Sequence, residues 1–233
     1  MTKLWRVLAC TAALGAIATP AQAALIYNFD LNGSYANSAG PGSIAPNGGS
    51  LGASGYTFAA NQGLTIGLGG NALTEYAIET RFSFDTTSSY RKVLDFFNRG
   101  SDTGLYIYSD RLTFYPAVSG PVVFSVGQLA TLRLERSASG QVTGYVDGVQ
   151  QFSFADTGNL AAFDGTDINL FMDDFATGQG EASSGYVDFV RVFDTASGTI
   201  GAIPEPSAWV LLILGFGITG AALRRRRAQL AFA

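Results

Sequence analysis

The segment from Thr74 to Asp85 alternates between apolar and polar side chains, with Tyr76, Ile78, Phe82 and Phe84 on its even positions. Successive side chains of a β-strand point to opposite faces, so a period of two puts these four apolar side chains on one face. A helix would need apolar residues every three or four positions, which this segment lacks. The segment therefore predicts a strand with one buried face and one solvated face.

A hairpin signal follows in the second half of the chain. The runs Gln141 to Val146 and Val149 to Phe154 are both rich in β-forming residues, and only Asp147 and Gly148 separate them. A type I′ turn needs positive φ at both central residues, which Asp and Gly tolerate. We therefore expect an antiparallel hairpin here, with the alternating segment Thr131 to Arg136 as a neighbouring strand.

Further short apolar runs recur between clusters of Gly, Ser, Asn and Asp, and no run has a helical period. The Gly- and Ser-rich stretch from Asn32 to Gly55 is interpreted as long loops. About a dozen short strands in one domain predict an all-β fold, an antiparallel sandwich of two stacked sheets. The remaining expected strands are Ile26–Phe29, Val93–Phe97, Leu105–Tyr108, Leu112–Tyr115, Val122–Val126, Ile168–Met172 and Tyr186–Phe193.

The C-terminal region has the pattern of a membrane span. Sixteen uncharged residues run from Ala208 to Leu223 and would cover roughly 24 Å of a hydrocarbon layer about 30 Å thick. Trp209 suits the outer interface, and the arginines after the span fix its orientation by the positive-inside rule. These arginines form a cluster of four consecutive residues, Arg224, Arg225, Arg226 and Arg227. We expect the cluster and the C-terminal end in the cytoplasm, and the chain before the span outside it.

The residues Pro204, Glu205 and Pro206 precede this span. Together with Trp209 and the arginine cluster, they resemble the PEP-CTERM sorting tail of Gram-negative bacteria. The resemblance implies recognition and cleavage near the tripeptide by an exosortase, a membrane enzyme associated with exopolysaccharide production. The alternative is an ordinary C-terminal anchor, which has no need for the two prolines that keep this segment extended.

The N-terminus has the pattern of a signal peptide. Lys3 and Arg6 precede an apolar stretch, and Ala21 and Ala23 form the small-x-small site that signal peptidase cleaves. Cys10 could instead be a lipidation site, although most of the apolar stretch follows it. We therefore predict a signal peptide over residues 1–23, a β-sandwich domain over 24–200 and a sorting tail over 201–233.

Composition excludes several classes of function. The chain has no histidine, which removes imidazole-dependent catalytic triads and zinc sites. Its single cysteine lies in the predicted signal peptide, so the mature domain has no disulfide. Without its two ends the domain keeps eight basic and 17 acidic residues, a formal net charge of −9. This charge argues against nucleic acid as a partner.

Three segments of the domain resemble the laminin-G-like branch of the concanavalin A-like jelly rolls: Tyr27–Asp30, Tyr145–Val149 and Gly185–Asp194. The resemblance implies a curved jelly-roll sandwich of a kind that often binds glycans or proteins and sometimes holds calcium. Because such folds host many activities, the fold does not choose among them.

Asp173, Asp174 and Glu181 form the most acidic group of the domain. Adjacent Asp residues at a strand end, followed by a Gly-rich loop with another carboxylate, can surround calcium with oxygen ligands. The alternative is that these acids are solvated loop residues or partners of arginines.

Aromatic residues raise a second question about binding. Most of the Phe and Tyr side chains have the spacing of core residues. Tyr106 with Tyr108 or Tyr115 would form a sugar-stacking platform only if these rings are exposed.

We expect a binding protein rather than an enzyme. Jelly-roll glycan hydrolases carry a Glu-x-Asp-x-x-Glu run on one strand, and this chain has none; Glu75 and Glu79 are better explained as paired surface charge. The predicted function is binding of exopolysaccharide at the cell surface or in an extracellular matrix or biofilm, after export across the inner membrane and transient anchoring. The alternatives are a structural matrix component without a specific ligand and, third, a glycan hydrolase.

Overall fold

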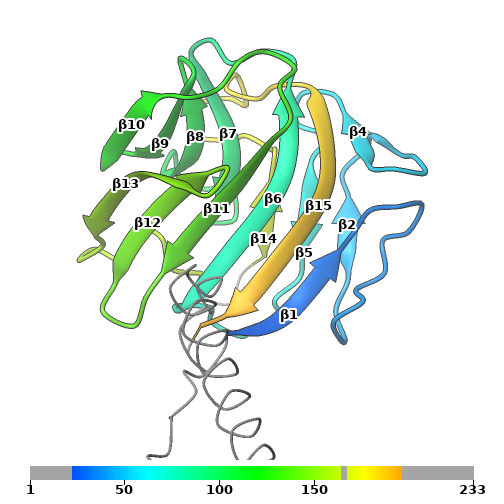
Figure 1. The fold of residues 1–233 in the computed structure, drawn as a ribbon, viewed down its shortest axis with the longest axis horizontal. Coiled ribbons are helices and arrows are strands. Elements are labelled where there is room, and N and C mark those ends of the chain that lie inside the picture. The colour runs from blue at the N-terminus through cyan, green and yellow to red at the C-terminus, as the bar shows by residue number, and fades with distance from the viewer. Residues whose placement is uncertain (1–22, 164–166, 196–233) are drawn as a thin grey trace, which may run out of the picture.

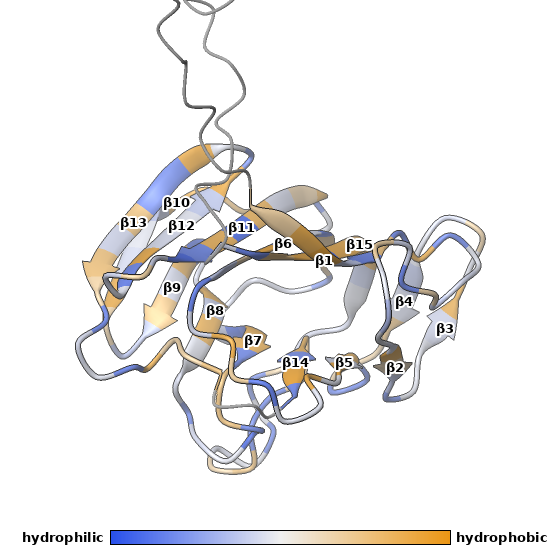
Figure 2. Cartoon of the chain, turned by 90° about the horizontal axis from the view of Figure 1, so that it is seen from below, coloured by the Kyte–Doolittle hydropathy of each residue, from blue (hydrophilic) through white to orange (hydrophobic). Residues whose placement is uncertain are grey.

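The protein folds into a sandwich of two antiparallel sheets (Figure 1). The computed structural model describes residues 23–163 and 167–195, and every regular element in those ranges is a strand. Viewed from the side, the two sheets lie as separate layers with a hydrophobic interior between them (Figure 2). The predicted all-β, two-sheet jelly-roll class is therefore confirmed.

The first sheet has eight strands. Its central strands β6 and β15 pair along nine positions, and β1 and β4 share the other edge of β15. In spatial order the strands are β13 (Val149–Ala155), β12 (Gln141–Val146), β11 (Ala130–Arg136), β6 (Tyr76–Phe84), β15 (Gly185–Asp194), β4 (Tyr56–Phe58) and β3 (Ser50–Leu51), with β1 (Ala24–Phe29) beside β15.

The second sheet has seven strands, and its outer face carries the candidate site. In spatial order they are β10 (Val118–Val122), β9 (Arg111–Tyr115), β8 (Gly104–Tyr108), β7 (Tyr90–Asp95), β14 (Ile168–Leu170), β5 (Leu64–Ile66) and β2 (Ile44–Pro46).

Local sequence signals explain the best-defined strands. In β6 the side chains of Tyr76, Ile78, Phe82 and Phe84 are all buried, as the period of two predicted. Asp147 and its glycine neighbour both have positive φ, and the strands on either side of them pair directly, so the hairpin is confirmed.

Other strand predictions were wrong in part. The stretch Asn32–Gly55, interpreted as loops, contains β2 and β3, which are only three and two residues long. A strand this short shows no measurable period. The run Val122–Val126 was predicted as a strand, but β10 ends at Val122. Gly120 and Pro121 mask β10 in the sequence, because both residues are unfavourable in strands.

Aromatic rings fill the centre of the core. Phe171 follows β14 and packs with its ring centroid 4.9 Å from that of Phe58 and 5.2 Å from that of Phe82. Its φ of 60° is rare for a bulky residue and turns the chain at this point. Because of this turn, the acidic residues that follow Phe171 do not continue β14 but cross to the outer side of β7.

Several predicted features lie outside the described residues. These are the signal peptide apart from Ala23, the tripeptide at 204–206, the apolar span and the arginine cluster. Within the described ranges, no helix is long and apolar enough to cross a membrane.

Candidate functional site

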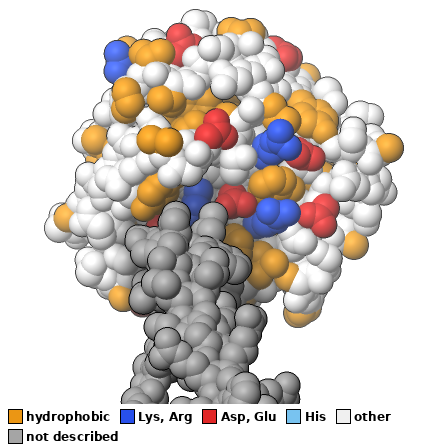
Figure 3. Space-filling view, viewed as in Figure 1, with side chains coloured by type: hydrophobic (Ala, Val, Ile, Leu, Met, Phe, Trp, Pro, Cys, Tyr) orange, Lys and Arg blue, Asp and Glu red, His pale blue; other side chains and the backbone are white. Residues whose placement is uncertain are grey.

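The outer face of the eight-stranded sheet carries charges of both signs among apolar side chains (Figure 3). Glu79 on β6 lies between Arg133 on β11 and Arg191 on β15, at 3.3 and 3.4 Å. Arg81 pairs with Asp188 at 3.2 Å. The interpretation of Glu79 as paired surface charge is therefore confirmed. Each of these five charged side chains is paired with another of them, so none is left unpaired to bind a ligand.

A different arrangement lies on the outer face of the seven-stranded sheet. Lys92 of β7 points away from the core, yet its side chain is fully buried. Its Nζ atom lies 2.5 Å from Oδ2 of Asp174, 3.5 Å from Oδ2 of Asp95 and 4.0 Å from Oδ1 of Asp173. We call these four residues the lysine cluster.

Two loops enclose the lysine cluster. Oδ1 of Asp95 accepts backbone hydrogen bonds from Phe97 and Arg99, which shape the loop after β7. In the loop after β14, Oδ1 of Asp174 accepts a hydrogen bond from the backbone N–H of Thr177. One buried ammonium group therefore fastens two loops to the outer face of the sheet.

The pKa values reflect this enclosure. Burial raises the pKa of the Asp95 carboxyl above its ordinary value, against backbone hydrogen bonds and the charge of Lys92, which lower it. Burial would also raise the pKa of Asp174, but the hydrogen bonds from Lys92 and Thr177 outweigh it and hold that pKa below its ordinary value. Between Asp95 and Asp174, Asp174 is therefore the carboxylate that more stably carries the charge opposite Lys92.

Two of the three acids predicted to bind calcium, Asp173 and Asp174, lie beside the ammonium group of Lys92, whereas the third, Glu181, reaches them through its backbone. Asp173 and Asp174 are fully buried, so the alternative that they are solvated loop residues is wrong. The backbone N–H of Glu181 donates to Oδ2 of Asp173 at 2.8 Å. Within residues 23–163 and 167–195, no three His, Cys, Asp or Glu side chains form a group that could hold a metal ion. Calcium binding stays a prediction that this arrangement does not favour, because Lys92 lies among the carboxylates.

Tyrosines lie beside the lysine cluster on the same face. Tyr90 of β7 stacks on Tyr108 of β8, with ring centroids 4.1 Å apart, and meets Tyr115 of β9 edge-on at 5.8 Å. Tyr108 and Tyr115 are 37 % and 36 % exposed. We call Tyr90, Tyr108 and Tyr115 the tyrosine platform. Tyr108 and Tyr115 thus meet the condition of exposure that a sugar-stacking platform requires.

Tyr106 has a different role from the one its sequence position suggested. It is fully buried beneath the platform, with its ring 4.8 Å from Nζ of Lys92. Its hydroxyl lies 2.8 Å from both the backbone oxygen and Oδ1 of Asp102. Burial, together with the Asp102 hydrogen bond, raises the pKa of Tyr106 far above its ordinary value, so its hydroxyl stays protonated. Tyr106 therefore joins the platform to the lysine cluster and is not itself a stacking surface.

Acidic side chains border the platform. The backbone N–H of Lys92 donates to the carbonyl oxygen of Glu181 at 2.8 Å, which places Glu181 beside the part of β7 that precedes its pairing with β14. Burial first, and then the charges of Asp102 and the two buried aspartates, raise the pKa of Glu181 above its ordinary value. We call Asp102 and Glu181 the acidic rim.

Sequence reasoning missed Tyr90, Lys92 and Asp95, and it missed Asp102. The expected strand Val93–Phe97 began three residues late, since β7 starts at Tyr90. A strand drawn from Tyr90 would have placed Tyr90 and Lys92 on one face by the period of two. No local signal indicated that the loop after β14 would cover this face.

A pocket of about 410 Å³ lies elsewhere, beside β1. Its lining is mostly apolar, and three of its polar side chains are already engaged: Tyr27 donates to the carbonyl of Gly67, Asn71 donates to that of Leu68, and Asp194 also interacts within the protein. We therefore place the candidate site at the tyrosine platform, which has both exposed rings and charged neighbours.

The comparison with protein families decides the nature of the C-terminal region. The PEP-CTERM protein-sorting motif matches residues 202–227. The chain carries a PEP-CTERM motif. This motif indicates an exported, surface-directed protein processed by exosortase, as predicted from Pro204, Glu205 and Pro206. The PEP-CTERM motif says nothing about the sandwich, which it does not cover.

Solved structures resemble the sandwich of this chain at low identity. Domain 4 of AbnA, a GH43 extracellular arabinanase from Geobacillus stearothermophilus in complex with arabinotriose, is 16 % identical with a TM-score of 0.53, over 74 % of this chain and 93 % of that domain. Trypanosoma rangeli sialidase is 12 % identical with a TM-score of 0.53, over 73 % of this chain and 30 % of the sialidase.

The binding domain of botulinum neurotoxin serotype D is a third similar structure. It is 10 % identical with a TM-score of 0.52, over 73 % of this chain and 48 % of the toxin domain. Identities this low show a shared sandwich fold and nothing further. No curated protein matches the sequence.

Proposed function

We propose that the sandwich is an exported glycan-binding domain whose contact surface is the tyrosine platform. The observation that carries this proposal is the cluster of Tyr90, Tyr108 and Tyr115, contributed by three adjacent strands on one outer face. A tyrosine ring offers a flat apolar surface with a polar tip, which suits the C–H faces and hydroxyls of a sugar.

The surroundings of the platform favour a rigid binding surface. Lys92 and its three carboxylates fasten the loops beside the platform, and the buried Tyr106 supports it from below at a ring distance of 5.4 Å from Tyr90. A surface that is already ordered loses little conformational entropy on binding. The similar AbnA domain was solved with arabinotriose, which supports a sugar as the class of ligand.

The finer features of localisation belong to the same proposal. Signal peptidase cleaves after Ala23 in the inner membrane of a Gram-negative bacterium, and the apolar span at 208–223 anchors the chain for a time through its arginine cluster. Exosortase then acts near residues 204–206, and the domain reaches the cell surface or matrix of a biofilm. There it binds exopolysaccharide and does not cleave it.

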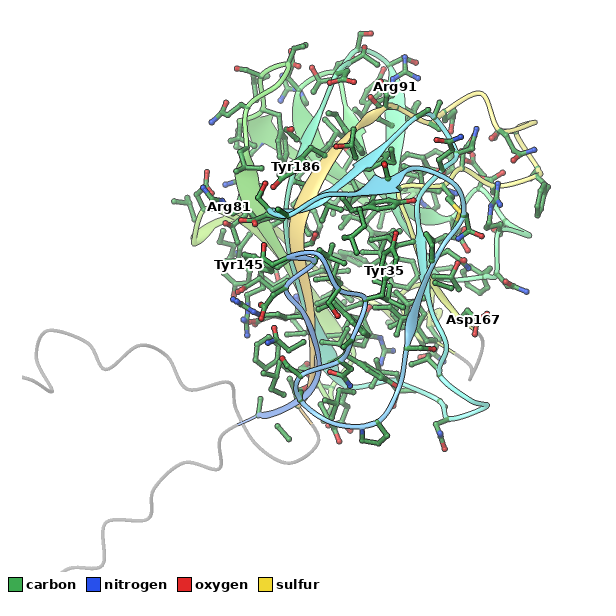
Figure 4. The ribbon with its side chains drawn as sticks, turned by 90° about the vertical axis from the view of Figure 1, so that its right-hand side faces the viewer. Tyr35, Arg81, Arg91, Tyr145, Asp167 and Tyr186 are labelled. Atoms are coloured by element: carbon green, nitrogen blue, oxygen red, sulfur yellow. The ribbon has the colours of Figure 1, made fainter. Side chains whose placement is uncertain are left out.

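A glycan array followed by calorimetry tests the proposal. We expect the parent domain to bind a defined set of oligosaccharides, and Tyr108→Ala with Tyr115→Ala to weaken binding by about tenfold or more, since each lost stack is worth about 0.5–1.5 kcal/mol. Tyr145→Ala, on the outer face of the other sheet (Figure 4), serves as the control and should leave binding unchanged.

Two results would decide against this function. A parent domain that binds no glycan would favour the alternative of a structural matrix component. Release of reducing sugar from the bound polysaccharide would favour a hydrolase. The double variant must keep the parent's thermal midpoint for its loss of binding to count.

A further inference from the structure

The charges around the tyrosine platform restrict the kind of sugar that it could hold. Two carboxylates, Asp102 and Glu181, form its rim. Asp102 is held there because the hydroxyl of Tyr106 lies 2.8 Å from its Oδ1 atom. Glu181 is held by backbone hydrogen bonds at both its N–H and its carbonyl, to Asp173 and Lys92.

The layer beneath the rim is also negative. Lys92 is one positive charge against three buried carboxylates, of which Asp174 takes the shortest contact. Oδ1 of Asp173 is buried and has no hydrogen-bond partner among the residues that the structure describes. The cluster therefore does not cancel the charge of the rim.

The nearby arginines donate to backbone carbonyls and not to the carboxylates of the rim. Arg91 donates to the carbonyls of Tyr90 and Gly180, and it lies at one end of the molecule (Figure 4). Arg111 of β9 pairs with Tyr108 of β8, and its guanidinium donates to the carbonyl of Gly120 on β10.

Arg99 packs against the ring of Phe175 and donates to the carbonyl of Asp173. Each of the three guanidinium groups is thus tied to a backbone carbonyl.

The pKa of Tyr90 in the platform reflects its burial and the neighbouring carboxylates of the rim. Burial raises the pKa of Tyr90, and the further contributions come from Tyr108, Tyr115, Glu181 and Asp102, all of which raise it. Two of these contributors are the carboxylates of the acidic rim, whose negative charge lies close to the ring of Tyr90. The potential at the platform is therefore negative, and it acts on whatever lies against the rings.

Resting on the proposed function, we infer that the tyrosine platform and its acidic rim select glycans that carry free amino groups on their sugar rings. A protonated amine would be attracted to the faces of Tyr108 and Tyr115 and would donate charge-assisted hydrogen bonds to Glu181 or Asp102. A uronic acid would instead bring a carboxylate against the rim, where like charges repel.

The experiment compares three oligosaccharides of equal length by calorimetry: a glucosamine oligomer, the same oligomer with every amine acetylated, and a galacturonate oligomer. We expect the free amine to bind about tenfold more tightly than its acetylated form and the galacturonate oligomer not to bind. The tenfold preference should shrink as salt is added.

Substitutions at the rim separate this inference from the proposed function. Glu181→Gln should bring the ratio of the two affinities close to one, because the ammonium group of the free amine loses a charged acceptor. Asp102→Asn keeps an acceptor for Tyr106 and should reduce the ratio in the same direction. Asp188→Asn, a carboxylate on the other sheet, is the matched control and should leave the ratio unchanged.

Each outcome has one meaning. Equal affinity of the parent for free and acetylated oligomers, or tighter binding of galacturonate, overturns the amino-sugar inference and leaves glycan binding standing. An unchanged ratio in both rim variants also overturns it. If the parent binds none of the three oligomers and no other glycan of the array, the proposed function itself fails.

Discussion

Lys92 on β7 and Asp174 in the loop after β14 form an ion pair, with Nζ and Oδ2 2.5 Å apart and neither side chain exposed. The two residues are 82 positions apart in the sequence. Breaking a buried pair by removing one partner leaves an uncompensated charge, which costs about 3–5 kcal/mol. The pair is therefore one of the contacts that hold the loop after β14 against the sheet beside the tyrosine platform.

Lys92→Met should lower the free energy of unfolding by about 3–5 kcal/mol, because three carboxylates then lose their counter-charge. Denaturant unfolding measures this change. The control is Arg81→Met, which breaks the partly exposed pair with Asp188 and should cost no more than about 1 kcal/mol. Equal losses in the two variants would show that the lysine cluster contributes no more than a surface pair.

The calcium hypothesis can be tested with the same protein. Because Lys92 lies among the carboxylates of Asp173 and Asp174, we expect calcium and magnesium to change the thermal midpoint equally at matched ionic strength. An ion that bound only the folded state at a hundredfold excess over its Kd would add about 2.7 kcal/mol. A calcium-specific rise that disappears in Asp173→Asn with Asp174→Asn would establish the metal site instead.

Affinity for an amino-glycan should depend on pH through Glu181. Its pKa is raised above the ordinary 4.5 by burial and by neighbouring carboxylates. The ionised form is the one that accepts from an ammonium group, so affinity should be full above the raised pKa, as long as the amine of the glycan keeps its proton, and should fall as the pH drops through that pKa. The fall should begin above pH 4.5.

Calorimetric titrations of the glucosamine oligomer across this range measure the profile. In Glu181→Gln the fall should vanish, because the amide does not titrate. A parent profile that stays flat down to pH 4.5 would contradict the role given to Glu181.

Gly63 tolerates no side chain, because a Cβ there would lie 1.8 Å from the carbonyl oxygen of Leu170 on β14. Gly63→Ala should therefore cost about 3 kcal/mol of stability, since backbone must move to relieve the overlap. Gly40 has no atom within 4 Å of such a Cβ and no positive φ, so Gly40→Ala is the control. We expect thermal unfolding to separate the two variants, and similar midpoints would mean that β14 can shift freely.

Replacing Pro204, Glu205 and Pro206 with alanine should keep the protein full length and membrane-bound in its host, whereas the parent should accumulate in a shorter form. Immunoblots of membrane and released fractions measure this difference. Ser207→Ala, next to the tripeptide, is the control and should be processed like the parent. Normal processing of the alanine variant would refute the sorting role of the tripeptide.

The sequence by itself determined the features that rest on short-range patterns. The period of two in Thr74–Asp85 set the buried face of β6, and Asp147 with Gly148 set the hairpin between β12 and β13, because pleat and turn geometry involve neighbouring residues only. The tripeptide before the apolar span identified the sorting motif for the same reason.

The tertiary structure alone decided the site. Tyr90, Tyr108 and Tyr115 become one surface only after β7, β8 and β9 pair in register. Asp173 and Asp174 look like solvated loop acids or calcium ligands in the sequence. Their partner is Lys92 on the distant strand β7, and the turn at Phe171 brings the two aspartates over it. Electrostatic energy depends on distance and burial in space, and neither can be read from spacing along the chain.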